Sequence, residues 1–205
     1  MSLQTASSVT LPGVEARRGV VGPNAVLQLV DPLRAAGGDR LLGDVFRRAG
    51  LSRYLATPPL AMVPQEEARR LFGATREFLD PERADAVLRD AGAGTAAYVM
   101  ANRIPGFARG LLRVLPPRPA AKLLLAAIQR HAWTFAGSGS CRVHLTGRTA
   151  TLEIEHNPLA TPGCAWHAGV LETLFRRLVS RKAVLRHPSC EARTGDCCRF
   201  ELRLP

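Results

Sequence analysis

A chain of 205 residues, of which 46% are hydrophobic, can bury the core of one large domain, and no apolar run of about 18 residues predicts a membrane-spanning helix. The net charge of +11 comes almost entirely from scattered arginines, and only 5% of residues are aromatic, so no nucleic-acid partner is predicted. The polar N-terminus lacks the apolar segment of a signal peptide, so we expect a cytoplasmic protein whose five cysteines bind metal or stay as free thiols.

The N-terminal half is predicted to be mostly helical. Residues 1–21 show no sustained hydrophobic period and are expected to form a flexible arm. Between residues 22 and 136, apolar residues recur at helical spacing and are separated by glycine and proline breaks. Asp80-Pro81-Glu82 is the strongest helix start, because an N-cap residue precedes a proline at the first helical position.

Two finer expectations concern this helical part. Gly92 and Gly94 are expected to interrupt the helix that starts at Pro81. The last helix is expected to carry a single apolar face that includes Leu124, Ile128, His131 and Phe135.

Residues 137–205 change to a strand period. Val143 and Leu145 alternate with polar neighbours, Gly147-Arg148 is a candidate hairpin turn, and alternation resumes over residues 150–155. An amphipathic helix over Cys164–Ser180 and two short strands complete a β-β-α-β-β unit. The predicted fold is therefore α+β, with N-terminal helices packed against a C-terminal antiparallel sheet, and residues 22–205 are expected to form one compact domain.

The C-terminal part contains a metal-ligand pattern. Cys164, His187, Cys190 and Cys198 stand in the order C-x22-H-x2-C-x7-C, and three thiolates with one imidazole suit a closed tetrahedral zinc. Four protein donors leave no open position, so such a zinc would be structural. Buried, unliganded cysteines are the alternative. Cys197 could replace Cys198, although Cys198 shares a strand face with Phe200, and Cys141 is expected to be a free core thiol.

At this point a family resemblance is visible. The C-terminal segment resembles the 4-vinyl reductase domain through Asn157-Pro158, Cys164, Gly169-x-Leu171-Glu172, Cys190, Gly195-Asp196 and Cys198-Arg199-Phe200. Upstream strings resemble the members of that family that act in bacteriochlorophyll biosynthesis: Gly22-Pro23-Asn24-Ala25, Ala101-Asn102-Arg103-Ile104-Pro105 and residues 131–139.

The resemblance implies a helix-flanked antiparallel sheet around an apolar ligand cavity, often dimeric and similar to trafficking-complex subunits. In related phenol-sensing regulators, zinc is held by Cys, Glu, Cys and Cys. By spacing these ligands fall on Cys164, His187, Cys190 and Cys198 of this chain, so that His187 takes the place of Glu.

The resemblance also implies a chlorophyll-precursor tetrapyrrole as ligand. His131 is the candidate axial ligand to its magnesium, and Arg103, with Arg109 and Arg113, is a candidate partner of a carboxylate. The remaining candidate wall residues are Trp133, Phe135, Tyr98 and His156. For each of these side chains the alternative is an ordinary role in the core or on a solvated face.

The activity that the family implies is reduction of the 8-vinyl group of a divinyl chlorophyllide precursor. This reduction needs an electron or hydride donor, and the sequence has no dinucleotide, flavin or iron–sulfur motif. We therefore expect a tetrapyrrole carrier, and keep a reductase with an unseen reductant and a sensing domain as alternatives. The expected partners are pathway enzymes and a second copy of the chain, acting in the cytoplasm at the inner face of the photosynthetic membrane.

Overall fold

The computed structural model describes residues 19–194 and 196–205. In chain order its elements are β1 (Val20–Val21), α2 (Asn24–Leu27), α3 (Val30–Arg48), α4 (Arg53–Ala56), β2 (Val63–Pro64), α5 (Gln65–Phe78), α6 (Pro81–Asn102), α7 (Gly106–Val114), α8 (Pro117–Arg130), α9 (Trp133–Ala136), β3 (Ser140–Thr146), β4 (Thr149–Glu155), α10 (Ala165–Leu178), β5 (Val184–Ser189), α11 (Glu191–Thr194) and β6 (Cys198–Arg203). The expected arm lies outside the described residues except for its last three, of which Val20 and Val21 form β1.

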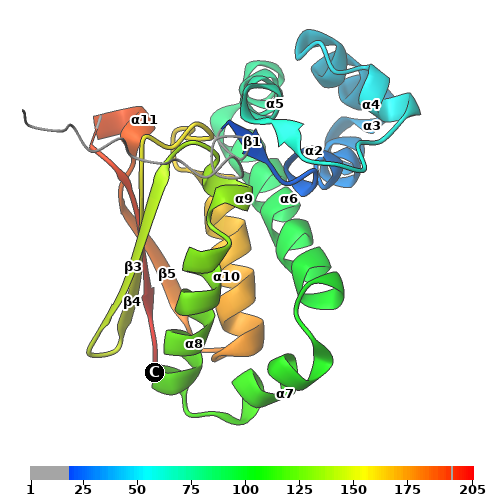
Figure 1. Ribbon diagram of the computed structural model, residues 1–205. Coiled ribbons are helices and arrows are strands. Elements are labelled where there is room, and N and C mark those ends of the chain that lie inside the picture. Colours follow the sequence, from blue (N-terminus) through cyan, green and yellow to red (C-terminus); the bar gives the residue numbers. More distant parts are fainter. Residues whose placement is uncertain (1–18, 195) are drawn as a thin grey trace, which may run out of the picture.

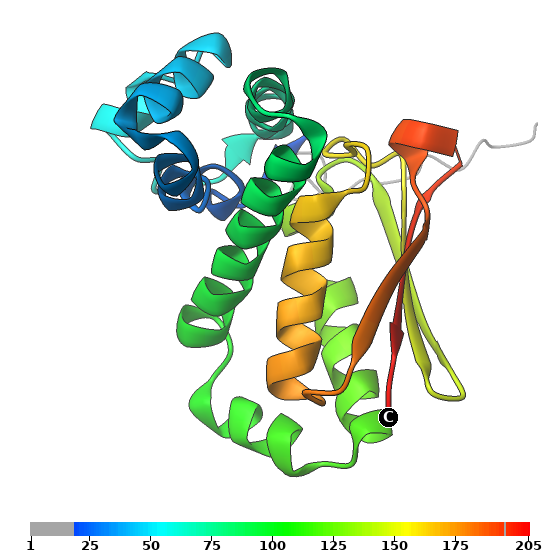
Figure 2. The same ribbon diagram turned by 180° about the vertical axis from the view of Figure 1, so that it is seen from behind.

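The C-terminal part is a four-stranded antiparallel sheet with strand order β3-β4-β6-β5. Helices α8 and α10 cover one face, and the other face is open to solvent (Figures 1 and 2). The open face carries ion pairs such as Arg199–Glu153 at 2.7 Å, whereas the covered face carries Leu152 and Phe200, which pair across β4 and β6. The predicted α+β class and the β-β-α-β-β order are confirmed, including the turn at Gly147 with a φ of 57°.

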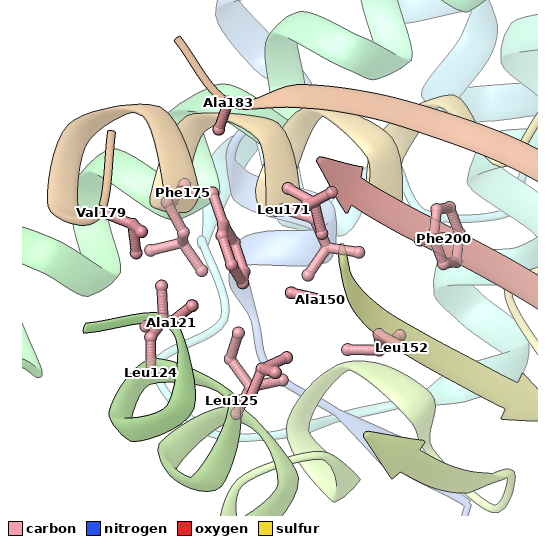
Figure 3. Packing of buried hydrophobic residues seen from close by; sticks show 14 of the residues in the cluster. Ala121, Leu124, Leu125, Ala150, Leu152, Leu171, Phe175, Val179, Ala183 and Phe200 are labelled. Atoms are coloured by element: carbon pink, nitrogen blue, oxygen red, sulfur yellow. The ribbon is translucent and has the colours of Figure 1, made fainter. Parts of the chain in front are cut away.

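The main core lies between this sheet and its helices. Figure 3 shows Leu124 and Leu125 from α8 facing Leu171 and Phe175 from α10, with Leu152 on the sheet beside them. These side chains are almost fully buried, and each contributes about 1.5–3 kcal/mol of transfer free energy on burial. The amphipathic periods of α8, α10 and the strands therefore meet in one apolar layer.

A second core forms among the N-terminal helices α2, α3 and α5 and the first half of α6. Trp166, in the first turn of α10, reaches into it and packs against Phe72 with ring centroids 5.6 Å apart. Helices α6 and α10 thus connect the two cores, and they lie side by side in both views (Figures 1 and 2).

The expected interruption of α6 at Gly92 and Gly94 is wrong, because the helix is continuous from Pro81 to Asn102. A Cβ on Gly92 would lie 2.1 Å from the carbonyl oxygen of Trp166, and one on Gly169 would lie 2.1 Å from that of Arg89. The glycines let the backbones of α6 and α10 touch, which no other residue allows at this separation.

The local start and stop signals are otherwise placed as expected. The Asp80 side chain accepts a hydrogen bond from the backbone N–H of Arg83 at 3.0 Å, as an N-cap should. The predicted face with His131 and Phe135 is wrong, because α8 ends at Arg130 and the chain turns into α9. Among the described residues, the structure has no helix with both the length and the apolar character needed to cross a bilayer.

Candidate metal centre

Three cysteines and one histidine from separate segments meet under the sheet. The ligand atoms of Cys164, His187, Cys190 and Cys198 all lie within 4.8 Å of one another. Cys164 immediately precedes α10, His187 lies on β5, Cys190 follows β5, and Cys198 begins β6. The three cysteines are fully buried, so the cluster joins one helix to two neighbouring strands away from solvent.

Local backbone features aim these side chains at one point. Cys164 has a left-handed backbone (φ 42°, ψ 43°) directly after Gly163, so the chain turns sharply as it enters α10. The pairing of β5 with β6 shifts register between Arg186 and Ser189, where Pro188 cannot donate to the ladder. Within this irregularity the His187 ring stacks on Phe200 at 4.5 Å.

A polar shell supports the sulfurs. The Asn157 amide nitrogen donates to Cys198 Sγ at 3.4 Å, and the Thr161 carbonyl accepts from Cys190 Sγ at 3.3 Å. Asn157 is itself held by Glu191, whose carboxylate accepts from its backbone N–H at 2.7 Å. Sequence reasoning used Asn157 only as part of the family motif and missed this supporting role, for which the motif was the available signal.

The donor geometry fits a tetrahedral zinc. Cys164 Sγ lies 3.3 Å from Cys198 Sγ and 3.6 Å from Cys190 Sγ, close to the roughly 3.8 Å expected around zinc with bonds of about 2.3 Å. The Nε2 atom of His187 is buried and has no hydrogen-bond partner in the described part of the chain, as expected of an atom reserved for a metal. The cluster can therefore hold a metal ion with four protein donors.

The electrostatics of the thiols favour an anionic sulfur. The hydrogen bond from Cys164 lowers the pKa of Cys198, and the same contact raises the pKa of Cys164. One thiolate is thus stabilised within the cluster, and a cation would allow the remaining thiols to ionise as well.

The other sulfurs and the nearby histidine lie outside the cluster. Cys197 is half-buried, and its carbonyl accepts a hydrogen bond from Ser189. Cys141 is a free thiol on β3 whose pKa burial raises to about 12. His167 lies one turn into α10, and its Nε2 is 3.2 Å from the carbonyl oxygen of Phe135.

The structure divides the six candidate tetrapyrrole-binding residues between two places. Trp133 and Phe135 are half-buried on α9, next to the exposed His131. His156 does not continue the buried face of β4, because its φ of 52° turns the chain outward and its side chain is 91% exposed. It still lies near α9, since Gly139 adjoins the carbonyls of both Ala136 and His156.

Tyr98 and Arg103 form the other group, at the C-terminal end of α6, and both are exposed. Phe135 is linked through His167 to the start of α10, which meets α6 at Gly92. At 1.5 Å per residue, Tyr98 lies about 9 Å and Arg103 about 16 Å farther along α6 from that level. Arg103 is thus well separated from the α9 group.

The chain is similar to known proteins along its whole length. Residues 154–204, which include α10, β6 and the cluster, match the 4-vinyl reductase domain. The chain is 41% identical over 204 residues to the bacteriochlorophyll synthase 23 kDa chain of Cereibacter sphaeroides, with 97% of each chain covered. It is 40% identical to the protein of the same name from Rhodobacter capsulatus, with 89% of this chain and 86% of that one covered.

Solved structures share the fold at low sequence identity. One from a study of haem distortion in the H-NOX family has a TM-score of 0.60 at 10% identity, covering 90% of this chain and 95% of that one. The Fe(II) unliganded H-NOX protein of K. algicida, in mutant form, has a TM-score of 0.57 at 13% identity, covering 89% and 96%. These likenesses extend the α+β architecture to nearly the whole chain. On its end-to-end sequence similarity, the chain belongs to the family of bacteriochlorophyll synthase 23 kDa chains.

Proposed function

We propose that the chain is a tetrapyrrole-binding accessory protein of bacteriochlorophyll biosynthesis, which holds a Mg-porphyrin or chlorophyllide precursor and delivers it to pathway enzymes. The observation that carries this proposal is the 41% identity over 97% of the chain to a protein named as one chain of bacteriochlorophyll synthase. The H-NOX proteins that share the fold were studied for haem distortion, and haem is also a tetrapyrrole. Both likenesses point to the same class of ligand.

The proposal assigns the Cys164, His187, Cys190 and Cys198 cluster to a structural zinc. Four protein donors complete the coordination of zinc, which prefers sulfur and imidazole nitrogen. A zinc held in this way offers no position to a substrate and carries no electrons, so its contribution is to tie α10 to β5 and β6. This role favours a carrier over an autonomous reductase.

The proposal places the macrocycle at the α9 group. His131 offers an exposed imidazole for magnesium, and Trp133 and Phe135 offer half-buried aromatic surface beside it. His156 lies on the adjoining turn, and its imidazole is the second candidate axial ligand. Tyr98 and Arg103 would then bind only a distant part of the ligand or its carboxylate.

The proposed protein partners are a pathway enzyme that receives the ligand and a second copy of the chain. The name of the relatives, a chain of bacteriochlorophyll synthase, supports the first. The second is supported by β3, an edge strand of seven residues whose outer side has no partner strand within the described residues. Both contacts are expected in the cytoplasm.

A spectroscopic titration tests the function. Purified protein is mixed with divinyl protochlorophyllide, with and without NADPH, and the absorption spectrum is followed to saturation. We expect a saturable spectral shift without loss of the vinyl group. His131→Ala should weaken binding or change the shift, whereas His144→Ala, an exposed histidine on β3, should not. A missing shift would overturn the carrier proposal, and vinyl loss beyond stoichiometric amounts would identify a reductase.

A further inference from the structure

Helix α7 exposes an apolar face that nothing in the described chain covers. Phe107, Leu111 and Val114 follow one another at i, i+4 and i+7, and they are 81%, 48% and 79% exposed. Leu112, on the opposite side, is buried in the main core and holds the helix in place. In both views α7 lies at the end of the molecule farthest from α3 and α4 (Figures 1 and 2). Large exposed apolar side chains grouped in this way mark a contact surface.

The chain around this face is uniformly basic. No aspartate or glutamate occurs between Asp90 and Glu153. The same interval contains eight cationic residues, Arg103, Arg109, Arg113, Arg118, Lys122, Arg130, Arg142 and Arg148. Arg109 and Arg113 lie on α7 itself, so positive charge directly flanks the apolar face.

More arginines gather where α7 meets the end of α10. An open cavity of about 790 Å³ there is lined by Arg113, Arg176, Arg177, Leu178, Val179, Ser180 and Arg181. Arg176 is paired with Glu172 at 3.3 Å. Within the described residues, Arg113, Arg177 and Arg181 have no carboxylate within salt-bridge distance, so these guanidinium groups remain available for an external anion.

We propose that this end of the molecule docks on an anionic lipid bilayer. Helix α7 lies flat in the interface with Phe107, Leu111 and Val114 among the acyl chains, and the arginines of the cavity bind headgroup phosphates. An amphipathic surface helix with cations beside its apolar face is the form that binds such interfaces. A lipid surface is favoured over a protein partner because it supplies apolar depth and a continuous negative charge together, which match this basic and apolar surface.

Vesicle sedimentation with the purified full chain tests the proposal. We expect binding to vesicles that contain phosphatidylglycerol, much weaker binding to phosphatidylcholine alone, and a decrease with added salt. Arg113→Gln and Arg181→Gln should each lower the partition coefficient about fivefold, as expected for roughly 1 kcal/mol per charge. The double variant Phe107→Ala with Val114→Ala should lower it about tenfold or more.

Two matched controls lie at the opposite end of the molecule. Leu60, which is 99% exposed in the loop before β2, is changed to alanine, and Arg40 on α3 is changed to glutamine. Both variants should bind vesicles as the unaltered protein does. Circular dichroism and zinc content should stay unchanged in every variant, since all the altered side chains are exposed.

Three results would overturn the proposal. One is no vesicle binding at low salt. Another is binding that Leu60→Ala and the α7 double variant reduce equally. The third is a dimer in light scattering that the α7 double variant converts to a monomer without any change in vesicle binding, which would make this face an interface between copies. Tetrapyrrole titration is measured separately, so failure of membrane docking is distinguishable from failure of the carrier function.

Discussion

The contact between α6 and α10 makes a sharp prediction about two glycines. In Gly92→Ala the new Cβ would lie 2.1 Å from the Trp166 carbonyl oxygen and 3.0 Å from the backbone nitrogen of Val170. Ordinary van der Waals contact begins near 3.4 Å, so the two helices would have to separate by more than 1 Å. Backbone atoms on both sides cannot rotate away, and the separation would disturb both cores.

The magnitude follows from two opposing effects. Alanine is favoured over glycine in a helix by about 1 kcal/mol, whereas overpacking costs about 1–3 kcal/mol or more. With backbone on both sides, we expect a net loss of about 3 kcal/mol from the free energy of unfolding. At about 2–4 °C per kcal/mol for a chain of this size, the melting temperature should fall by about 6–12 °C. Gly169→Ala, which would meet the Arg89 carbonyl oxygen, should behave alike.

The assay is urea and thermal unfolding of the zinc-loaded protein, with Gly73→Ala as the matched control. Gly73 lies within α5, and a Cβ there meets nothing within 4 Å, so this variant should be more stable by about 0.5–1 kcal/mol. The Gly92→Ala, Gly169→Ala double variant should lose less than the sum, because one separation of the helices relieves both clashes. A melting temperature for Gly92→Ala equal to that of Gly73→Ala would refute the backbone contact.

Two further predictions concern the cluster and its neighbour. Cys190→Ser should abolish stoichiometric zinc measured by mass spectrometry, and Asn157→Ala should lower zinc affinity roughly 10–100-fold, whereas Cys197→Ser should keep both; zinc-free unaltered protein would rule out the metal. Burial lowers the pKa of His167 to about 4, so the unfolded chain binds a proton that the folded chain refuses between pH 6.5 and 4. The free energy of unfolding should therefore decrease by roughly 3 kcal/mol as the pH falls through that window, and His167→Leu should remove this part of the pH dependence while leaving that of the zinc ligands.

Much of the fold could be predicted from local pattern. The alternation over β3 and β4, the glycine turn between them and the amphipathic period of α10 were enough to predict the order β-β-α-β-β. The cap at Asp80 was predictable because the side-chain chemistry at a helix start is local. The short strands β1 and β2 and the helix α11 were missed, since two to four residues carry no measurable period.

The candidate site divides along the same line. The four members of the cluster were identifiable because cysteine and histidine at these spacings have few other uses, and the structure brings their donor atoms within 4.8 Å. Their support by Asn157 and Thr161 was not identifiable, because it depends on a loop conformation rather than on residue type. His131 and His156 were expected to face inward, but the chain turns before each of them and leaves both exposed.

The sequence by itself determined the class of fold, the order of its strands, the Cys/His set and the family, because periodicity, turn chemistry and ligand type are properties of short segments. Only the tertiary structure decided that Gly92 and Gly169 join two helices rather than break them. It also decided that the candidate tetrapyrrole residues separate into two groups and that α7 presents Phe107 outward beside unpaired arginines. Each of these depends on which faces meet across long separations in the chain, and burial, unlike periodicity, is set by those distant partners.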